Sequence, residues 1–138
     1  MSNEKNRIEA LRWFETAEED IEAAEIMQAN NKHSHCCFLC QQASEKAIKA
    51  IYYNLDEDPW GHSIVKLIEG LKDVDPNISD LLKTHERDAR ILDRYYIPTR
   101  YPNGLPDIIP SQAYGAEDAV QSLDIAKRML SKVRDLIK

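Results

Sequence analysis

Apolar residues recur at helical spacing along most of the chain. Between residues 6 and 30 they follow the period of an amphipathic helix, with acidic residues on the other face. The apolar positions are Leu11, Phe14, Ala17, Ile21 and Ala24. The pattern therefore predicts a first helix over residues 6–30, which Asn30 or Asn31 can close.

Four more helices are predicted beyond residue 32. One covers residues 33–54, and its shared face carries small residues that let a neighbouring helix approach closely: Cys36, Cys40, Ala43, Ala47 and Ile51. Ser63 can cap a short helix with Ile64, Leu67, Ile68 and Leu71 on one face. A fourth helix is expected from about 78 to 95, with a buried stripe of Ile78, Leu81, Leu82, His85, Ala89 and Leu92.

The last predicted helix spans about residues 113–137. Its apolar positions alternate steps of four and three, a seam suited to antiparallel packing or to a dimer: Ala119, Leu123, Ala126, Leu130, Val133 and Ile137. No segment alternates with the period of a strand. We therefore expect an all-α protein, a single domain over residues 1–138. Its fold would be an up-and-down helical bundle of four main helices plus a short extra helix, with a proline-rich loop before the last helix.

Composition and charge narrow the class of protein. The chain has 138 residues, 43% hydrophobic and 30% charged, which is long enough to bury a core. A net charge of -6 argues against strong general affinity for nucleic acid, although a local basic patch stays open. The N-terminus is polar and no apolar run is long enough for a bilayer, so we expect a cytoplasmic protein without a membrane partner.

The segment His33–Cys40 is a candidate metal site. At helical spacing, His33, Cys36 or Cys37, and Cys40 could face one ion, but zinc sites usually combine two separated pairs, and there is no second pair. Buried, reduced thiols are the simpler interpretation. We predict no metal and no cofactor.

Residues 95–110, "YYIPTRYPNGLPDIIP", interrupt the helical pattern with prolines at 98, 102, 106 and 110. Arg87, Arg90 and Arg94 form a basic ridge just before this segment, and Arg100 lies within it beside Tyr95, Tyr96 and Tyr101. Guanidinium groups can hold phosphates while aromatic rings stack on a base. The alternative is a solvated face, balanced by neighbouring carboxylates such as Glu86 at the i, i+4 position to Arg90.

Three other positions could add to such a site. Lys46 and Lys49 follow one another by a turn, although Glu45 and Lys49 also have the spacing of an ordinary helical ion pair. His62 precedes a helix start, where it can either fix the turn or contact a ligand. His85 lies on the apolar stripe, so we expect it to be buried and hydrogen-bonded.

Four segments in order carry a family resemblance: "WFETAEEDIEAAEIM", "CFLCQQASEKAIKAIY", "GHSIVKLIEGL" and "LDRYYIPTRYPN". Over about residues 8–135 the chain resembles the HEPN domain family, in its small stand-alone prokaryotic form. The resemblance implies a helical bundle, a homodimer and a nucleotide-related role. It also implies a minimal nucleotidyltransferase partner in a two-component, toxin–antitoxin-like arrangement.

Many members of that family are metal-independent ribonucleases with an R-x4-6-H motif. No arginine precedes any of the four histidines at that spacing, and His85 and Arg90 stand in the reverse order. The resemblance therefore favours a binding component without catalytic activity alone. The alternatives are a ribonuclease whose displaced acid/base is His62 or His85, and a purely structural dimer.

The expected nucleotide- or partner-binding residues lie on three parts of the chain. The prolines should hold residues 97–110 in an extended path over the bundle, bringing the loop beside the basic ridge and the helix over 33–54. The expected site is Lys46, Lys49, His62, Arg87, Arg94, Tyr95, Arg100 and Tyr101.

Overall fold

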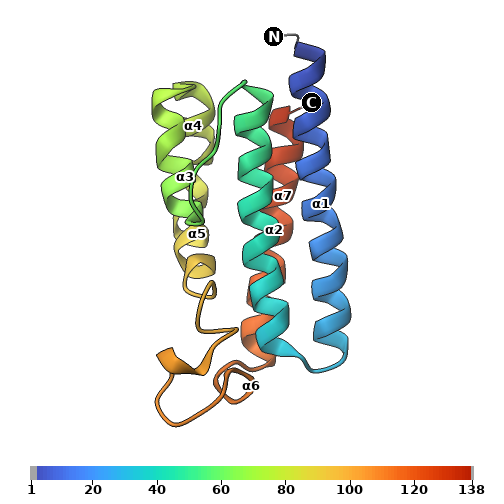
Figure 1. The fold of residues 1–138 in the computed structure, drawn as a ribbon, viewed down its shortest axis with the longest axis vertical. Coiled ribbons are helices and arrows are strands. Elements are labelled where there is room, and N and C mark those ends of the chain that lie inside the picture. The colour runs from blue at the N-terminus through green and yellow to red at the C-terminus, as the bar shows by residue number, and fades with distance from the viewer. Residues whose placement is uncertain (1–2, 138) are drawn as a thin grey trace.

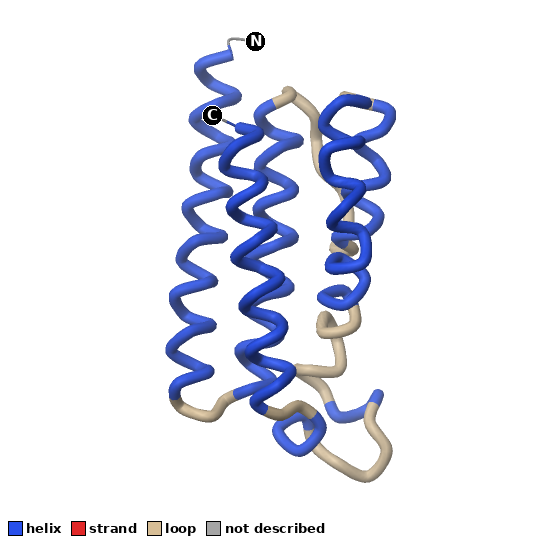
Figure 2. The backbone as a smooth tube through the Cα atoms, turned by 180° about the vertical axis from the view of Figure 1, so that it is seen from behind, coloured by secondary structure: helices blue, strands red, loops and turns tan. Residues whose placement is uncertain are grey.

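Three long helices lie side by side in the computed structural model, which describes residues 3–137 (Figures 1 and 2). They are α1 (Asn3–Ala29), α2 (His33–Asn54) and α7 (Ala116–Ile137). Asn31 has a φ of 61°, the left-handed conformation that commonly ends a helix, and it turns the chain from α1 into α2. No strand occurs among the described residues, and the predicted all-α bundle is confirmed.

A second group of helices flanks α2 on the side away from α1 (Figure 1). It consists of α3 (Ile64–Gly70), the 3-10 turn η1 (Leu71–Asp73), α4 (Pro76–Leu82), the 3-10 turn η2 (Lys83–His85) and α5 (Glu86–Asp93). Helix α2 is central, because it contacts α1, α7, α3 and α5.

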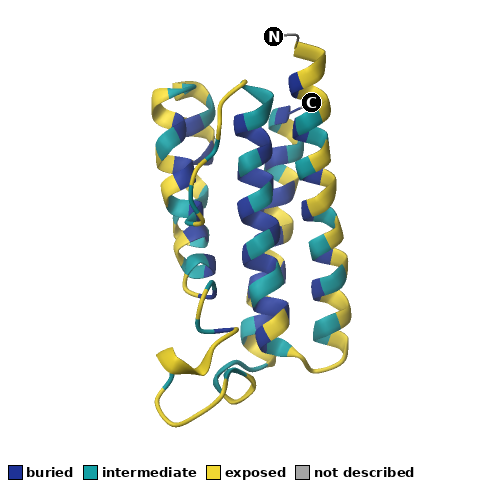
Figure 3. Cartoon of the chain, viewed as in Figure 1, coloured by how far each residue is buried: buried dark blue, intermediate teal, exposed yellow. Residues whose placement is uncertain are grey.

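The core lies between α2 and its neighbours, as the burial colours show (Figure 3). The predicted small-residue face of α2 is completely or almost completely buried, and so are all six positions of the α7 seam. Both predictions of buried faces are confirmed. Neither face is exposed, so a dimer of this chain must use another surface.

The fourth predicted helix is divided in two. Asp75 caps α4, its Oδ1 accepting from the backbone N–H groups of Asn77 and Ile78 at 3.1 and 3.2 Å. The turn η2 then separates α4 from α5, and its tighter winding rotates the side chains that follow it. Leu81, predicted to be buried, is 48% exposed, and the predicted continuous helix over 78–95 is wrong.

His85 also departs from the prediction. It is half-buried, and its Nδ1 atom is buried without a hydrogen-bond partner among the described residues. Burial lowers the pKa of His85, which favours the neutral ring. The histidine is thus a packing residue in η2, and the predicted hydrogen bond is absent from the described part of the chain.

The proline-rich segment does not lie in an extended path over the bundle. Residues 94–100 form tight turns, in which the Thr99 hydroxyl donates to the Tyr95 carbonyl and the Arg100 N–H donates to the Ile97 carbonyl at 3.0 Å. The short helices η3 (Pro102–Gly104) and α6 (Pro110–Ala113) follow. Most of residues 101–109 are exposed beyond the end of the bundle (Figures 1 and 3).

Within residues 3–137, no helix has the length and apolar character that crossing a membrane requires.

Candidate functional site

A buried carboxylate, Glu45, is the centre of a polar network on α2. Its side chain is 6% exposed, and its Oε2 atom lies 3.0 Å from the Lys49 ammonium and 3.3 Å from Nδ1 of His62. Gln41 donates to the other oxygen at 3.3 Å. These three partners offset the cost of removing the charge from water.

His62 is held in place from two sides. Gln41 also donates to the His62 carbonyl at 3.2 Å, which ties the loop before α3 to α2. The imidazole ring stacks on Tyr96 with centroids 5.1 Å apart and an interplanar angle of 17°. The side chain of His62 is nevertheless 62% exposed, so it can meet a ligand.

Asp93, the last residue of α5, fixes the start of α3. Its carboxylate accepts from the Ser63 hydroxyl at 2.8 Å and from the backbone N–H groups of Ile64 and Val65 at 2.8 and 3.1 Å. Ser63 Oγ in turn accepts from the Lys66 N–H at 3.1 Å, so the predicted Ser63 cap is confirmed. His62 and Tyr96 flank this bridge, which explains why their rings meet.

Arg100 joins the network through aromatic rings. Its guanidinium lies 4.4 Å from the ring of Phe38, 4.7 Å from Tyr96 and 5.2 Å from Tyr101. Its Nε also donates to the Tyr96 carbonyl at 2.9 Å. Cation–π contacts of this kind orient the charge while leaving it exposed to solvent. We call Glu45, Lys49, His62, Tyr96 and Arg100 the α2 face.

Two of the predicted site residues are only loosely related to this face. Lys46 turns toward α1, where its ammonium pairs with Asp20 at 2.7 Å. Tyr101 is 50% exposed and touches the face through Arg100.

A second surface, the arginine groove, runs between α5 and α7. It has a volume of about 450 Å³ and is lined by Arg87, Arg90, Arg94, Tyr95, Asp118 and Gln121, together with Ile91. The three arginines are exposed, and none forms an ion pair with a described residue. The Glu86–Arg90 pair that the alternative interpretation included is therefore not formed.

Tyr95 forms the buried part of the groove lining. Its ring is 8% exposed and packs edge-on against Tyr114, with centroids 5.5 Å apart. Its hydroxyl faces Asp118 Oδ1 at 3.5 Å. Burial, with the nearby charge of Asp118, raises the pKa of Tyr95 to about 12, so the hydroxyl stays protonated and can donate a hydrogen bond.

Six of the eight predicted site residues therefore fall on two surfaces rather than in one cleft. Arg87, Arg94 and Tyr95 line the groove, whereas Lys49, His62 and Arg100 belong to the α2 face. The division follows from the turn after Asp93, which sends the consecutive residues Tyr95 and Tyr96 to different partners.

The cysteines belong to the core. Cys36, Cys37 and Cys40 are fully buried, as the simpler interpretation expected, and burial raises the pKa of Cys37 to about 12. Residues 3–137 contain no group of three or more His, Cys, Asp or Glu side chains that could hold a metal ion.

Comparison with known proteins assigns the family. Residues 10–136 match the model of the HEPN domain. The chain belongs to the HEPN domain family. The HEPN chain is also similar to the curated protein "Putative toxin MJ1304" of Methanocaldococcus jannaschii, with 25% identity over 94% of this chain and 88% of that protein.

Solved structures agree with this assignment. The crystal structure of TT1696 from Thermus thermophilus superposes on the HEPN chain with a TM-score of 0.83 and 33% identity, covering 91% of this chain and 96% of that one. The crystal structure of ST0689, described as an archaeal HEPN homologue, gives a TM-score of 0.75 and 30% identity over 94% and 98% of the two chains.

Two residues that organise the α2 face and the start of α3, Glu45 and Asp93, could not be identified as such from the sequence. The sequence presents Glu45 only as a helical partner of Lys49, and it does not single out Asp93. The i, i+4 spacing of Gln41, Glu45 and Lys49 is visible in the sequence. The contacts of Glu45 with His62 and of Asp93 with Ser63 join segments that lie far apart in the chain, and they cannot be seen in the sequence.

Because Glu45 is buried, we expect that removing its charge alone destabilises the fold more than removing the charges of Glu45 and Lys49 together. Glu45→Gln leaves Lys49, whose side chain is 11% exposed, without its counter-charge, so we expect the free energy of unfolding to fall by about 2 kcal/mol. Adding Lys49→Met should recover part of that loss. Urea unfolding followed by circular dichroism measures both changes.

The exposed pair of Lys127 and Glu25 is a matched control. Its separation is also 3.0 Å, but both side chains are about half exposed. Glu25→Gln should therefore cost less than about 0.5 kcal/mol. Equal losses in Glu45→Gln and Glu25→Gln would contradict the assigned role of Glu45.

Proposed function

We propose that this HEPN protein is the nucleotide- and partner-binding component of a toxin–antitoxin-like two-component module. Its partners would be a second copy of the chain and a minimal nucleotidyltransferase protein, and it would have no catalytic activity alone. Similarity to a protein named as a toxin supports the module. The lack of an R-x4-6-H sequence supports binding over cleavage.

The observation that carries the proposal is the arginine groove. Three guanidinium groups without acidic partners among the described residues line one groove of a protein whose net charge is -6. Their mutual repulsion is relieved when an anion binds between them. Guanidinium groups bind phosphate oxygens through paired N–H donors, which makes a phosphate-bearing ligand the best fit.

The shape of the groove favours an extended ligand over a single phosphate. Arg87 and Arg94 are seven positions apart, which corresponds to about 10 Å along a helix. The phosphate chain of a nucleoside di- or triphosphate can contact several groups over such a stretch. Asp118 and Gln121, which α7 contributes to the lining, provide an acceptor and an amide for the sugar or the base.

Removing two arginines tests the nucleotide site. We expect Arg87→Ala combined with Arg94→Ala to weaken ATP or ADP binding by about tenfold or more, as measured by isothermal titration calorimetry. Wild-type affinity should also fall as salt is added, because the contacts are ionic.

The control for net charge is Lys66→Ala combined with Lys83→Ala, which removes two exposed cations elsewhere. That double variant should bind as the wild type does. Absence of nucleotide binding by the wild type, or equal affinity in the arginine variant, would refute this part of the proposal.

One observation favours a second candidate, a ribonuclease with a displaced acid/base. The Glu45 carboxylate lies 3.3 Å from Nδ1 of His62, and this arrangement leaves the other ring nitrogen to exchange a proton with a substrate. Arg100 lies on the same face through Tyr96, where it could hold a phosphate.

Incubation of labelled single-stranded RNA with the pure protein separates the two candidates. The binding proposal predicts no cleavage by the wild type above a blank. Cleavage that disappears in His62→Ala, but persists in the control His35→Ala at an exposed α2 position, would instead establish the ribonuclease.

A further inference from the structure

The arginine groove opens into a second hollow between α5 and α7, of about 610 Å³. Both are lined by Arg87, Ile91 and Gln121, so together they form one longer groove, which we call the α5–α7 groove. Part of its lining is apolar: Ile125 is buried, Ile91 is half-buried and Val120 is 49% exposed. Apolar residues within a polar rim are the usual composition of a protein–protein contact.

The two walls of this groove carry opposite charges. Asp88 on α5 and Arg128 on α7 neutralise each other in an ion pair of 3.2 Å. The charges that remain are three arginines on the α5 side and three carboxylates on the α7 side: Arg87, Arg90 and Arg94, and Glu117, Asp118 and Asp124. None of these six side chains forms an ion pair with a described residue. Within the part of the chain that the structure describes, each wall therefore lacks a paired counter-charge.

A second copy of the chain supplies the missing counter-charges. When two grooves face each other across a two-fold axis that runs parallel to the helices, the α5 wall of each copy lies opposite the α7 wall of the other. Arginines then face carboxylates twice in the same dimer, an arrangement that electrostatic complementarity favours. The same contact removes the exposed Val120 of both copies from water. One groove thus contains both halves of a self-complementary surface.

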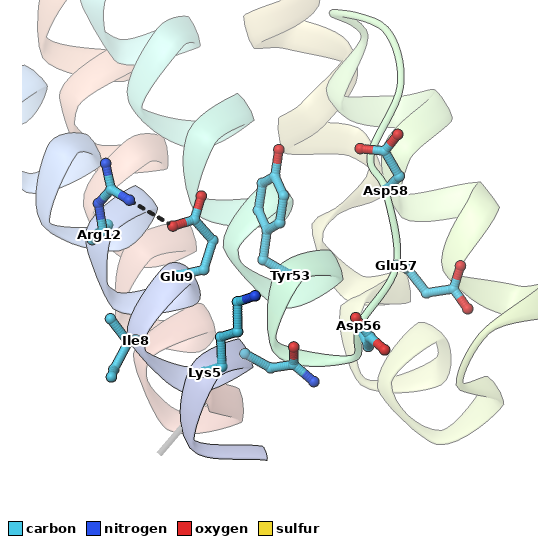
Figure 4. Close-up of a pocket in the computed structure, with 9 residues that line it drawn as sticks. Lys5, Ile8, Glu9, Arg12, Tyr53, Asp56, Glu57 and Asp58 are labelled. Carbon is cyan, nitrogen blue, oxygen red and sulfur yellow. Dashed lines mark hydrogen bonds and ion pairs between the residues drawn. The ribbon is translucent and has the colours of Figure 1, made fainter. Parts of the chain in front are cut away.

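Other surfaces suit a second copy less well. The pocket between α1 and the loop after α2 has a volume of about 460 Å³ (Figure 4). There Arg12 is paired with Glu9 of its own helix at 2.9 Å, and the acids Asp56, Glu57 and Asp58 are consecutive on one exposed loop rather than opposite a cationic wall. The small-residue face of α2 and the α7 seam are buried within the chain. The α5–α7 groove is therefore the surface that best fits self-association.

Self-association and nucleotide binding would use the same guanidinium groups. In the dimer the arginines face carboxylates, and in the nucleotide complex they face phosphate oxygens. A second copy that covers the groove blocks the nucleotide, and a bound nucleotide cancels the charge that attracts the second copy. Because binding linkage is reciprocal, each event must weaken the other.

We propose that the α5–α7 groove is the contact between two copies of this chain, and that a phosphate-bearing ligand competes with the second copy for its arginines. The self-association stands on the groove alone. The competition rests on the proposed nucleotide binding.

Charge reversal on either wall tests the contact. Analytical ultracentrifugation at about 50 µM should show a wild-type dimer. Arg90→Glu combined with Arg94→Glu reverses the charge of the α5 wall, and Glu117→Lys combined with Asp124→Lys reverses that of the α7 wall. Like charges then meet in either homodimer, so the dissociation constant of each variant should rise at least about a hundredfold. Circular dichroism verifies that both variants are folded.

An equimolar mixture of the two variants gives the sharpest outcome. In the mixed pair, the acidic α5 wall of one variant faces the basic α7 wall of the other, and the two native walls face each other as in the wild type. Dimers should therefore return on mixing, with a dissociation constant within about tenfold of the wild-type value. The control Lys66→Glu with Lys83→Glu makes the same change in net charge as the arginine variant, on exposed side chains elsewhere, and should remain a dimer.

Excess ATP tests the competition. It should raise the dissociation constant of the wild-type dimer at least about tenfold, whereas adenosine, which has no phosphate, should leave it unchanged. The double variant Glu117→Lys with Asp124→Lys keeps all three arginines of the groove, so in calorimetry it should bind ATP at least as tightly as the wild type does.

The possible results separate the contact from the nucleotide site. A wild-type monomer, dimers that persist in both charge-reversed variants, or a mixture that stays monomeric would overturn the proposed contact. ATP binding without dissociation of the dimer would overturn the competition. A wild type that binds no nucleotide refutes both the nucleotide site and the competition, while the ultracentrifugation of the variants still decides the contact.

Discussion

The carboxylate of Asp93 at the start of α3 is the contact on which the arrangement of the outer helices depends. A seven-residue helix such as α3 is not stable alone, because nucleation costs more than so few hydrogen bonds return. Asp93 supplies acceptors for two N–H groups that have no partner within the helix, and its charge complements the helix dipole. Since Asp93 also ends α5, one side chain sets the start of one helix against the end of the other.

Both candidate surfaces take their form from the point where α5 ends. Around this point, the exposed side of the α5 segment presents three arginines toward α7. Beyond it, the turns of residues 94–100 place Tyr96 against His62 and bring Arg100 over three aromatic rings. One surface therefore carries guanidinium groups without an ion pair among the described residues, and on the other the charge of Glu45 is paired with Lys49. That difference is why we propose phosphate binding for the groove and consider proton transfer only for the α2 face.

The parts of the fold that follow from local pattern could be predicted, and the parts that depend on distant contacts could not. The periodicity of α1, α2 and α7 located their buried faces, because a long amphipathic helix has few other ways to bury its apolar stripe. The break at Lys83–His85 has no proline or glycine to mark it, so the sequence indicated one continuous helix. The arginine ridge was visible as spacing, whereas the separation of Tyr95 from Tyr96 depends on which neighbours each ring meets after the chain turns.

Hydrogen exchange of the Ile64 and Val65 amides, measured by NMR in the wild type and in Asp93→Ala, tests the central role of this carboxylate most directly. Both amides should be protected in the wild type and should exchange at least about tenfold faster in the variant, since their acceptor is lost. The contact between the His62 and Tyr96 rings should weaken in the same variant, while amides in α1, α2 and α7 keep their protection. Unchanged protection of Ile64 and Val65, with the two rings still stacked, would show that Asp93 does not hold this part of the protein together.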